Sequence, residues 1–218
     1  MEPPGPKREL KRPPSPKRLA TEERLKRAVG EVLRKSGVQG LGINAVAAEA
    51  KVDKVLIYRY FGGLPELLAA YGERTEFWPD LPELLGDDVS ALLTGSYGDI
   101  AENLLRRYFA ALTKRPVTLK LLAWECVEST PLTEALEAVR ERRSETLFSA
   151  LGEMGLVLPA QIRTAAILFS AALQYLAIRR RDLPVFGGLS IQDDRGMERI
   201  FSDIKKLFDA LGASLQAD

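Results

Sequence analysis

Apolar residues near the N-terminus recur at intervals of three and four positions, the spacing of one face of an α-helix. The first such run extends from Thr21, a suitable N-cap, to Gly37. A second run covers residues 43–50, and a third begins after Asp53, another suitable cap, and ends at Phe61. Two short helices joined by a tight turn predict a helix-turn-helix.

The rest of the chain has the same helical period. A fourth helix is expected from Pro65 to residue 77, because proline suits the first turn of a helix. Residues 78–97 are broken by proline and glycine and predict a loop with room for one short helical turn. Five helical segments follow, and no β-period competes with them: 98–114, 116–127, 131–153, 159–181 and 196–215. The predicted fold is all-α, with about nine helices.

The third helix presents an unusual outward side. On a helical wheel Ile57 and Phe61 fall together and can close on the first two helices. The remaining positions carry cationic, aromatic and aliphatic side chains: Lys54, Val55, Leu56, Tyr58, Arg59 and Tyr60. Such side chains suit a DNA duplex, since cations and tyrosine hydroxyls bind phosphates and apolar groups touch thymine methyls. The alternative is a protein-contact helix, because arginine and aromatic residues also mark protein interfaces.

Charge is unevenly distributed along the chain. Residues 1–60 contain 14 Lys or Arg and 7 Asp or Glu, a net charge of +7, while the remainder has 17 and 23, a net charge of −6. A basic module on an acidic carrier is typical of proteins that bind polyanions. Residues 1–19 are rich in proline and basic residues and predict a flexible arm, which either contacts DNA or is only a disordered leader.

Several classes of protein are excluded by composition. The chain has no histidine, so Ser-His-Asp, Cys-His and Cys/His zinc sites are impossible, and no cofactor is expected. Glu125 and Glu128 share a helical face, but without a matching second pair they make a weak case for an enzyme. Cys126 is the single cysteine, no run of 18 apolar residues is present, and the N-terminus has no apolar signal region. A cytoplasmic protein without a membrane partner is expected.

Residues 21–68, and above all the segment "VAAEAKVDKVLIYRYFGGLPELL", resemble the N-terminal domain of the TetR (tetracycline repressor-like) family. The resemblance implies a helix-turn-helix domain at residues 20–64, with the six outward residues of the third helix facing DNA. It implies an effector-binding and dimerisation domain at residues 65–218. Lys51 stands where the family often has a turn glycine, so a positive φ there would carry a modest cost.

The last two segments are apolar over a wide face, and a helix buried nearly all round needs several partners. Packing against a two-fold copy would make a four-helix interface, which the resemblance also implies. The alternative is an ordinary core within one chain. The residues expected at the interface are Phe169, Leu173, Ile200, Phe201, Ile204 and Phe208.

A ligand pocket is expected in the C-terminal domain because relatives commonly have one. The candidate lining is apolar and could equally be solid core: Leu105, Tyr108, Phe109, Leu122, Trp124, Cys126 and Phe148. The polar candidates are Arg107, Glu125, Glu128 and Arg143, which could also be solvated charges. Cys126 has no base or cation beside it in the sequence and is expected to be inert.

The expected function is a homodimeric transcriptional regulator, with repression as its mode, that binds an inverted-repeat operator in double-stranded DNA and is released by a small apolar effector. This mechanism comes from the resemblance. The alternative is a helical module that binds DNA without regard to sequence or bridges proteins, which the basic arm also fits.

Overall fold

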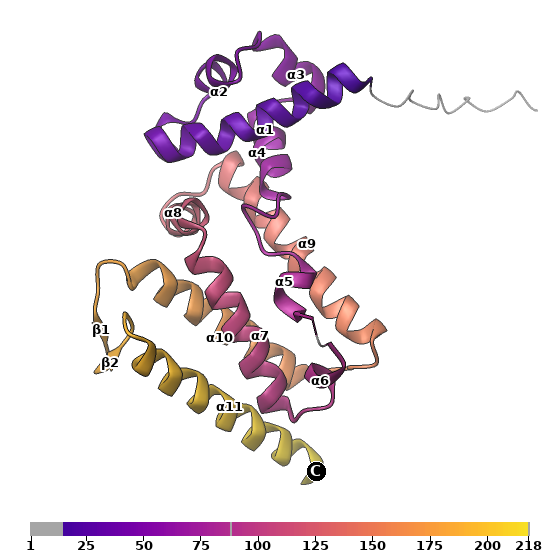
Figure 1. The fold of residues 1–218 in the computed structure, drawn as a ribbon, viewed down its shortest axis with the longest axis vertical. Helices are drawn as coiled ribbons and strands as arrows, with labels where there is room; N and C mark the ends of the chain where they lie inside the picture. Colours follow the sequence, from indigo (N-terminus) through magenta and orange to yellow (C-terminus); the bar gives the residue numbers. More distant parts are fainter. Residues whose placement is uncertain (1–14, 88, 218) are drawn as a thin grey trace, which may run out of the picture.

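The computed structural model of the chain describes residues 15–87 and 89–217. Figure 1 shows a small head of helices at one end, a connecting helix, and a body of longer helices. The head consists of α1 (Pro16–Ser36), the 3-10 helix η1 (Val38–Gly40), α2 (Ile43–Glu49) and α3 (Val55–Phe61), and α4 (Leu64–Gly72) leads out of it. The body contains α5 (Leu81–Leu85), α6 (Val89–Leu93), α7 (Tyr97–Thr113), α8 (Pro116–Glu125), α9 (Pro131–Glu153), α10 (Ala160–Arg179), strands β1 (Val185–Phe186) and β2 (Leu189–Ser190), and α11 (Asp194–Ala217). The all-α prediction is confirmed.

Helix α1 begins five residues earlier than predicted. The hydroxyl of Ser15 accepts a hydrogen bond from the backbone N–H of Arg18 at 3.3 Å, and Pro16 occupies the first helical position. Serine as N-cap followed by proline is a strong start signal, which outweighs the weaker one at Thr21. Residues 16–19, expected in the flexible arm, are therefore helical, and residues 1–14 of that arm lie outside the described residues.

Helix α4 packs closely against α1 of the head and against α9 of the body, and a glycine lies at each contact. A methyl group on Gly30 of α1 would lie 3.1 Å from the ring of Tyr71 on α4. A methyl group on Gly72 would lie 3.2 Å from Leu136 and 3.5 Å from Val139, both on α9. Helix α4 ends at Gly72 rather than at residue 77, and the turns that follow it bury Phe77 and Trp78.

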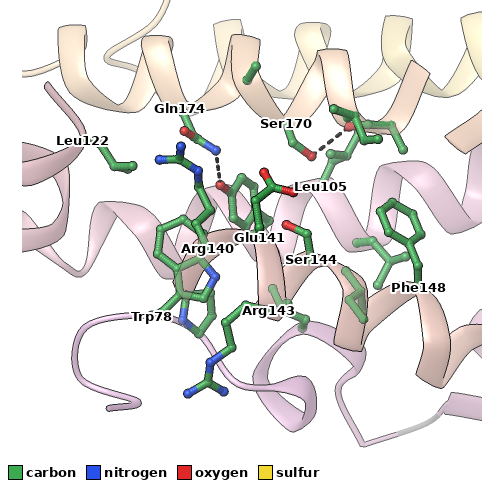
Figure 2. A pocket seen from close by; sticks show the side chains of 18 of the residues that line it. Trp78, Leu105, Leu122, Arg140, Glu141, Arg143, Ser144, Phe148, Ser170 and Gln174 are labelled. Atoms are coloured by element: carbon green, nitrogen blue, oxygen red, sulfur yellow. Dashed lines mark hydrogen bonds between the residues drawn. The ribbon is translucent and has the colours of Figure 1, made fainter. Parts of the chain in front are cut away.

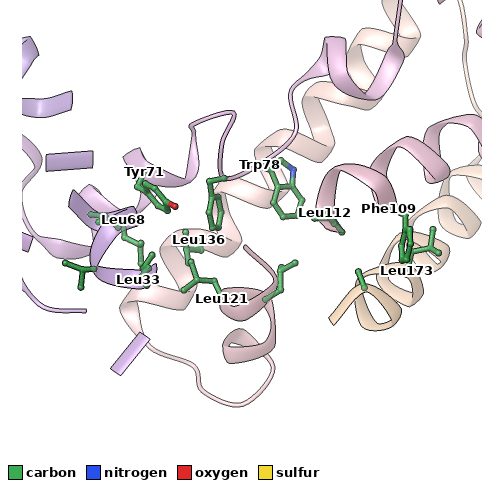
Figure 3. Packing of buried hydrophobic residues seen from close by; sticks show 14 of the residues in the cluster. Leu33, Leu68, Tyr71, Trp78, Phe109, Leu112, Leu121, Leu136 and Leu173 are labelled. Atoms are coloured by element: carbon green, nitrogen blue, oxygen red, sulfur yellow. The ribbon is translucent and has the colours of Figure 1, made fainter. Parts of the chain in front are cut away.

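The hydrophobic core is continuous from head to body. Fully buried leucines and aromatic residues extend from α1 and α4 through α8 and α9 to α7 and α10, as Figure 3 shows. The segment predicted as a loop instead contains the two short helices α5 and α6. Asp80 caps α5, and Leu85 and Leu92 form a second, smaller core with Leu151 of α9.

The broad apolar face of α11 is covered within the chain. Helix α11 packs mainly along α7, and the rings of Phe201 and Phe109 meet edge to face with centroids 5.9 Å apart. Phe208 packs against Phe169 of α10 and is 1% exposed. Four predicted interface residues, Leu173, Phe201, Ile204 and Phe208, are thus fully covered inside one chain, and Phe169 and Ile200 are half-buried. The alternative of an intrachain core is correct for these four.

Helix α10 keeps an uncovered apolar stripe on its outer side. The stripe comprises Thr164, Ile167, Leu168, Ala171, Ala172 and Tyr175, all exposed. Within the described part of the chain, α10 is also the one helix that is long and apolar enough to cross a membrane by length and composition, a test that core helices of soluble proteins also pass. It packs against α7, α8 and α11, and the hairpin β1–β2 follows it.

Candidate nucleic-acid interface and ligand pocket

Helix α3 is held by one buried side and exposes the other. Ile57 is completely buried and anchors α3 to the head. Asp53 steadies its start, since a carboxylate oxygen accepts from the N–H of Val55 at 2.8 Å. Val55 is 51% exposed and Tyr58 is 54% exposed, which is unusual for large apolar or aromatic side chains.

The two cations on this helix are available to an outside partner. Lys54 and Arg59 are exposed, and neither forms an ion pair with any residue in the described ranges. Many arginines of the body, in contrast, are paired with glutamates, for example Arg115 with Glu83 at 2.5 Å. Unpaired cations beside exposed tyrosine on one short helix match the requirements of a phosphate backbone.

Leu56 and Tyr60 are less exposed than the sequence suggested. Both are half-buried, and Tyr60 packs against the core of the head. The guanidinium of Arg18, at the start of α1, lies 4.9 Å above the Tyr60 ring. This contact places exposed Lys17 and Arg18 beside the end of α3. Sequence reasoning assigned both residues to a separate arm, and the Ser-Pro start signal was the clue that could have placed them.

The turn between α2 and α3 contains a strained residue. Lys51 has φ of 52°, and it is the one non-glycine residue with positive φ in the described chain. A side chain in this left-handed region costs about 1 kcal/mol or more relative to the right-handed one. The turn therefore takes the conformation for which glycine is usual, despite the lysine.

A cavity of about 520 Å³ lies between α7, α8, α9 and α10. Five of the seven predicted residues line it: Leu105, Tyr108, Leu122, Cys126 and Phe148. The other two do not. Phe109 packs against Phe201, and the indole N–H of Trp124 donates to Glu128 at 3.0 Å. The volume lies within the usual range for small-molecule sites.

Further lining residues were not among those predicted. They include Trp78 after α4, Arg140, Glu141 and Ser144 on α9, and Ser170 and Gln174 on α10, as Figure 2 shows. Of the predicted polar candidates, Glu125, Glu128 and Arg143 line the cavity. Arg107 does not, because its guanidinium donates to the backbone carbonyl of Leu85.

The polar groups gather towards one part of the cavity. The Arg140 guanidinium donates to the Glu125 carboxylate, and the Gln174 amide donates to the Tyr108 hydroxyl at 2.6 Å. Burial raises the pKa of Glu125, and the charge of Arg140 partly opposes that shift. Burial also raises the pKa of Tyr108, so the phenol is a neutral group at physiological pH. The remaining walls are mostly aliphatic, with Leu147, Leu151 and Ile162 among them.

No group of three His, Cys, Asp or Glu side chains in the described part of the chain is arranged to hold a metal ion. The Cys126 thiol lies at the exposed end of α8 and donates to the carbonyl of Leu122 at 3.3 Å. The cavity is therefore suited to binding through apolar contacts, hydrogen bonds and charge.

The head has the architecture of a helix-turn-helix DNA-binding domain, with α3 in the place of the recognition helix. Residues 28–71 match the family model described as "Bacterial regulatory proteins, tetR family". This match agrees with the resemblance noted for residues 21–68, and it covers the head and α4 only.

Solved structures with the same fold are TetR-family regulators. HlyIIR, a hemolysin II transcriptional regulator, has 15% identity and a TM-score of 0.54, with 88% of this chain and 98% of that chain covered. A regulator from Streptomyces coelicolor has 17% identity and a TM-score of 0.58, with 91% and 86% covered. BioQ from Mycobacterium smegmatis has 18% identity and a TM-score of 0.56, with 88% and 97% covered. At these sequence identities the similarity shows a shared fold and no more. No curated protein matches the chain in a sequence search.

Proposed function

We propose that this protein is a ligand-responsive transcriptional regulator, acting as a repressor, that binds an inverted-repeat operator as a homodimer. The observation that carries the proposal is the exposed face of α3, where Lys54 and Arg59 have no ion pair within the described ranges and Val55 and Tyr58 are about half exposed. In the major groove, the cations and the tyrosine would bind phosphates or guanine edges, and Val55 would meet a thymine methyl.

The proposed dimer contact is the apolar stripe of α10. Leu168 is 65% exposed and Ile167 is 51% exposed, and the small Ala171 and Ala172 between them and Tyr175 permit close helix approach. We propose a second copy of the chain, rather than a lipid bilayer, as the partner of this stripe. Arg163 and Arg179 lie within α10, and charged residues line the exposed side of α11, and such side chains are costly to place in a bilayer. The half-buried Ile200 and the exposed Leu207 on α11 would join the contact.

Ligand binding in the cavity would act on the head through α9 and α4. Arg143 lines the cavity and also binds Glu73, the residue that ends α4. A ligand that shifts Arg143 or the α9 backbone would move the C-terminal end of α4, and with it the head that α4 carries. In a dimer, such a movement would change the separation of the two α3 helices and weaken operator binding.

Selection of the purified protein against a random pool of duplex DNA at near-physiological salt tests the proposal. We expect an enriched inverted repeat with half-sites about one helical turn apart. Retention of DNA without a shared sequence would instead favour a sequence-indifferent module, and absence of retention would refute DNA binding through α3. A protein with this role would act in the cytoplasm.

A further inference from the structure

The cavity lining contains more negatively charged than positively charged side chains. There are four carboxylates and two guanidinium groups: Glu125, Glu128, Glu137, Glu141, Arg140 and Arg143. Arg140 is bound by Glu125, and the nearest oxygen of Glu137 is 3.9 Å from the same guanidinium. Arg143 is occupied by Glu73, which lies outside the lining. Both cations are therefore already neutralised, and negative charge remains in excess.

Glu141 is the clearest uncompensated charge in the lining. Glu141 is exposed, and its carboxylate neither forms an ion pair with nor accepts a hydrogen bond from any residue in the described ranges. Figure 2 shows its side chain rising from α9 into the cavity beside Arg140 and Ser144. It lies one helical turn after Glu137 on the same face, and two like charges at this spacing repel each other.

The wall opposite Glu141 offers no positive charge. Helix α10 contributes only neutral side chains to the lining: Ile162, Ala166, Ile167, Ser170, Ala171, Gln174, Tyr175 and Ile178. Arg163 and Arg179 of α10 are not part of the lining, and the Arg163 guanidinium instead stacks on the Phe148 ring at 4.5 Å. An apolar concave site lined by one sign of charge raises the local concentration of ligands of opposite sign.

We infer that the cavity takes an apolar organic cation, with its positive group at Glu141 and its apolar part against the aliphatic and aromatic walls. This inference rests on the proposed role of the cavity as a ligand site and adds the charge of the ligand. The rings of Trp78 and Tyr108, 6.1 Å apart, add aromatic surfaces of the kind that favour a cation. An anionic ligand would have to displace Glu125 from Arg140 and remain near Glu137 and Glu141.

The test compares three probes that share one apolar chain and differ in charge: octyltrimethylammonium, octanoate and 1-octanol. Binding to the full protein is measured by calorimetric titration at pH 7.5, below the micellar concentration of each probe. We expect the cation to bind about tenfold more tightly than octanol, and octanoate to bind more weakly than both. Glu141→Gln is expected to lower the affinity for the cation about tenfold and to leave the affinity for octanol within about twofold.

Glu145→Gln is the matched control, because Glu145 lies one turn later on α9, is exposed and does not line the cavity. It should leave binding of all three probes unchanged. Equal affinities for the cation and octanol, or no effect of Glu141→Gln on the cation, would overturn the charge inference and leave the cavity as a ligand site. If none of the probes binds the correctly folded protein, the role of the cavity as an apolar ligand site is refuted as well.

Discussion

The Arg143 guanidinium on α9 donates to the backbone carbonyl of Glu73 at the end of α4, and its Nε lies 3.2 Å from the Glu73 carboxylate. The same arginine lines the cavity. One side chain thus contacts both the proposed ligand site and the helix that carries the DNA-binding head. Arg143 is therefore a suitable place to test how the two regions are coupled.

Replacement of Arg143 should loosen the end of α4. We expect Arg143→Ala to lower the free energy of unfolding by about 1.5 kcal/mol, since a hydrogen bond from a charged donor that is 24% exposed is lost. It should also increase hydrogen exchange at residues 69–74. Arg142→Ala is the control, because Arg142 pairs with the same glutamate from an exposed position and should cost about 0.5 kcal/mol or less. Equal effects of the two variants in urea denaturation would argue against a special role for Arg143.

Arg59 should contribute to DNA affinity and not to folding. Arg59→Ala is expected to weaken binding to the selected operator by about 1–3 kcal/mol, or roughly ten- to a hundredfold in Kd. The far-ultraviolet circular dichroism should not change, because the side chain is exposed and unpaired within the described ranges. Fluorescence anisotropy with labelled duplex measures the affinity. Arg34→Ala, on the exposed end of α1, should bind like the parent protein, and a similar loss in both variants would discard α3 as the docking face.

Leu168 tests the proposed dimer contact. Leu168→Glu should give a monomer in sedimentation velocity with the helix content and melting temperature of a folded chain, because the residue is exposed in the single chain. Phe208→Glu should instead unfold the protein, since its side chain is buried against α10. A Leu168→Glu protein that remains dimeric would move the interface away from the α10 stripe.

The turn at Lys51 should become more stable with glycine. Lys51→Gly removes the steric cost of positive φ and is expected to raise the free energy of unfolding by up to about 1 kcal/mol. Lys51→Val should lower it, because a β-branched residue tolerates this conformation less well than lysine. Thermal melting of the parent protein, Lys51→Gly and Lys51→Val gives the order of their stabilities. A valine variant as stable as the glycine variant would show that the turn relaxes to negative φ.

Asp99 should make stability depend on pH under acidic conditions. Its hydrogen bonds with Lys205, at 2.7 Å, and with Ser96 lower its pKa from 3.8 to about 2. A lowered folded-state pKa means that the stabilisation is fully present above about pH 4 and is lost as the pH falls towards 2. In urea denaturation across this range, Asp99→Asn should lose less stability on acidification than the parent protein. Asp182→Asn, at an exposed carboxylate, should behave like the parent protein. If Asp99→Asn loses as much stability on acidification as the parent protein, Asp99 is not the cause of the pH dependence.

The head could be predicted from the sequence because its signals are local. The period of the apolar residues and the composition of α3 lie within a few residues of the structures that they specify. The N-cap of α3 is Lys54 rather than the predicted Asp53, whose carboxylate instead accepts from the N–H of Val55. The predicted start of α1 at Thr21 is wrong, because the hydroxyl of Ser15, which proline follows directly, caps the helix instead. The sequence also indicated that Lys51 would be strained if the turn kept the φ usual for glycine.

The body was less predictable because its decisive contacts join distant residues. Periodicity identified Phe201, Ile204 and Phe208 as one apolar face, but it could not show that α7 and α10 cover that face within the chain. The ion pairs from Arg140 to Glu125 and from Arg143 to Glu73 span 15 and 70 residues and follow no local pattern. The charge of the cavity depends on these pairs, so it could not be derived before the helices were placed.

Three residues of the α10 stripe, Ile167, Ala171 and Tyr175, also border the cavity. A second copy docked on the stripe would therefore form part of the cavity wall. Association of chains and occupancy of the cavity would then be linked through these three residues, in addition to any movement of the heads.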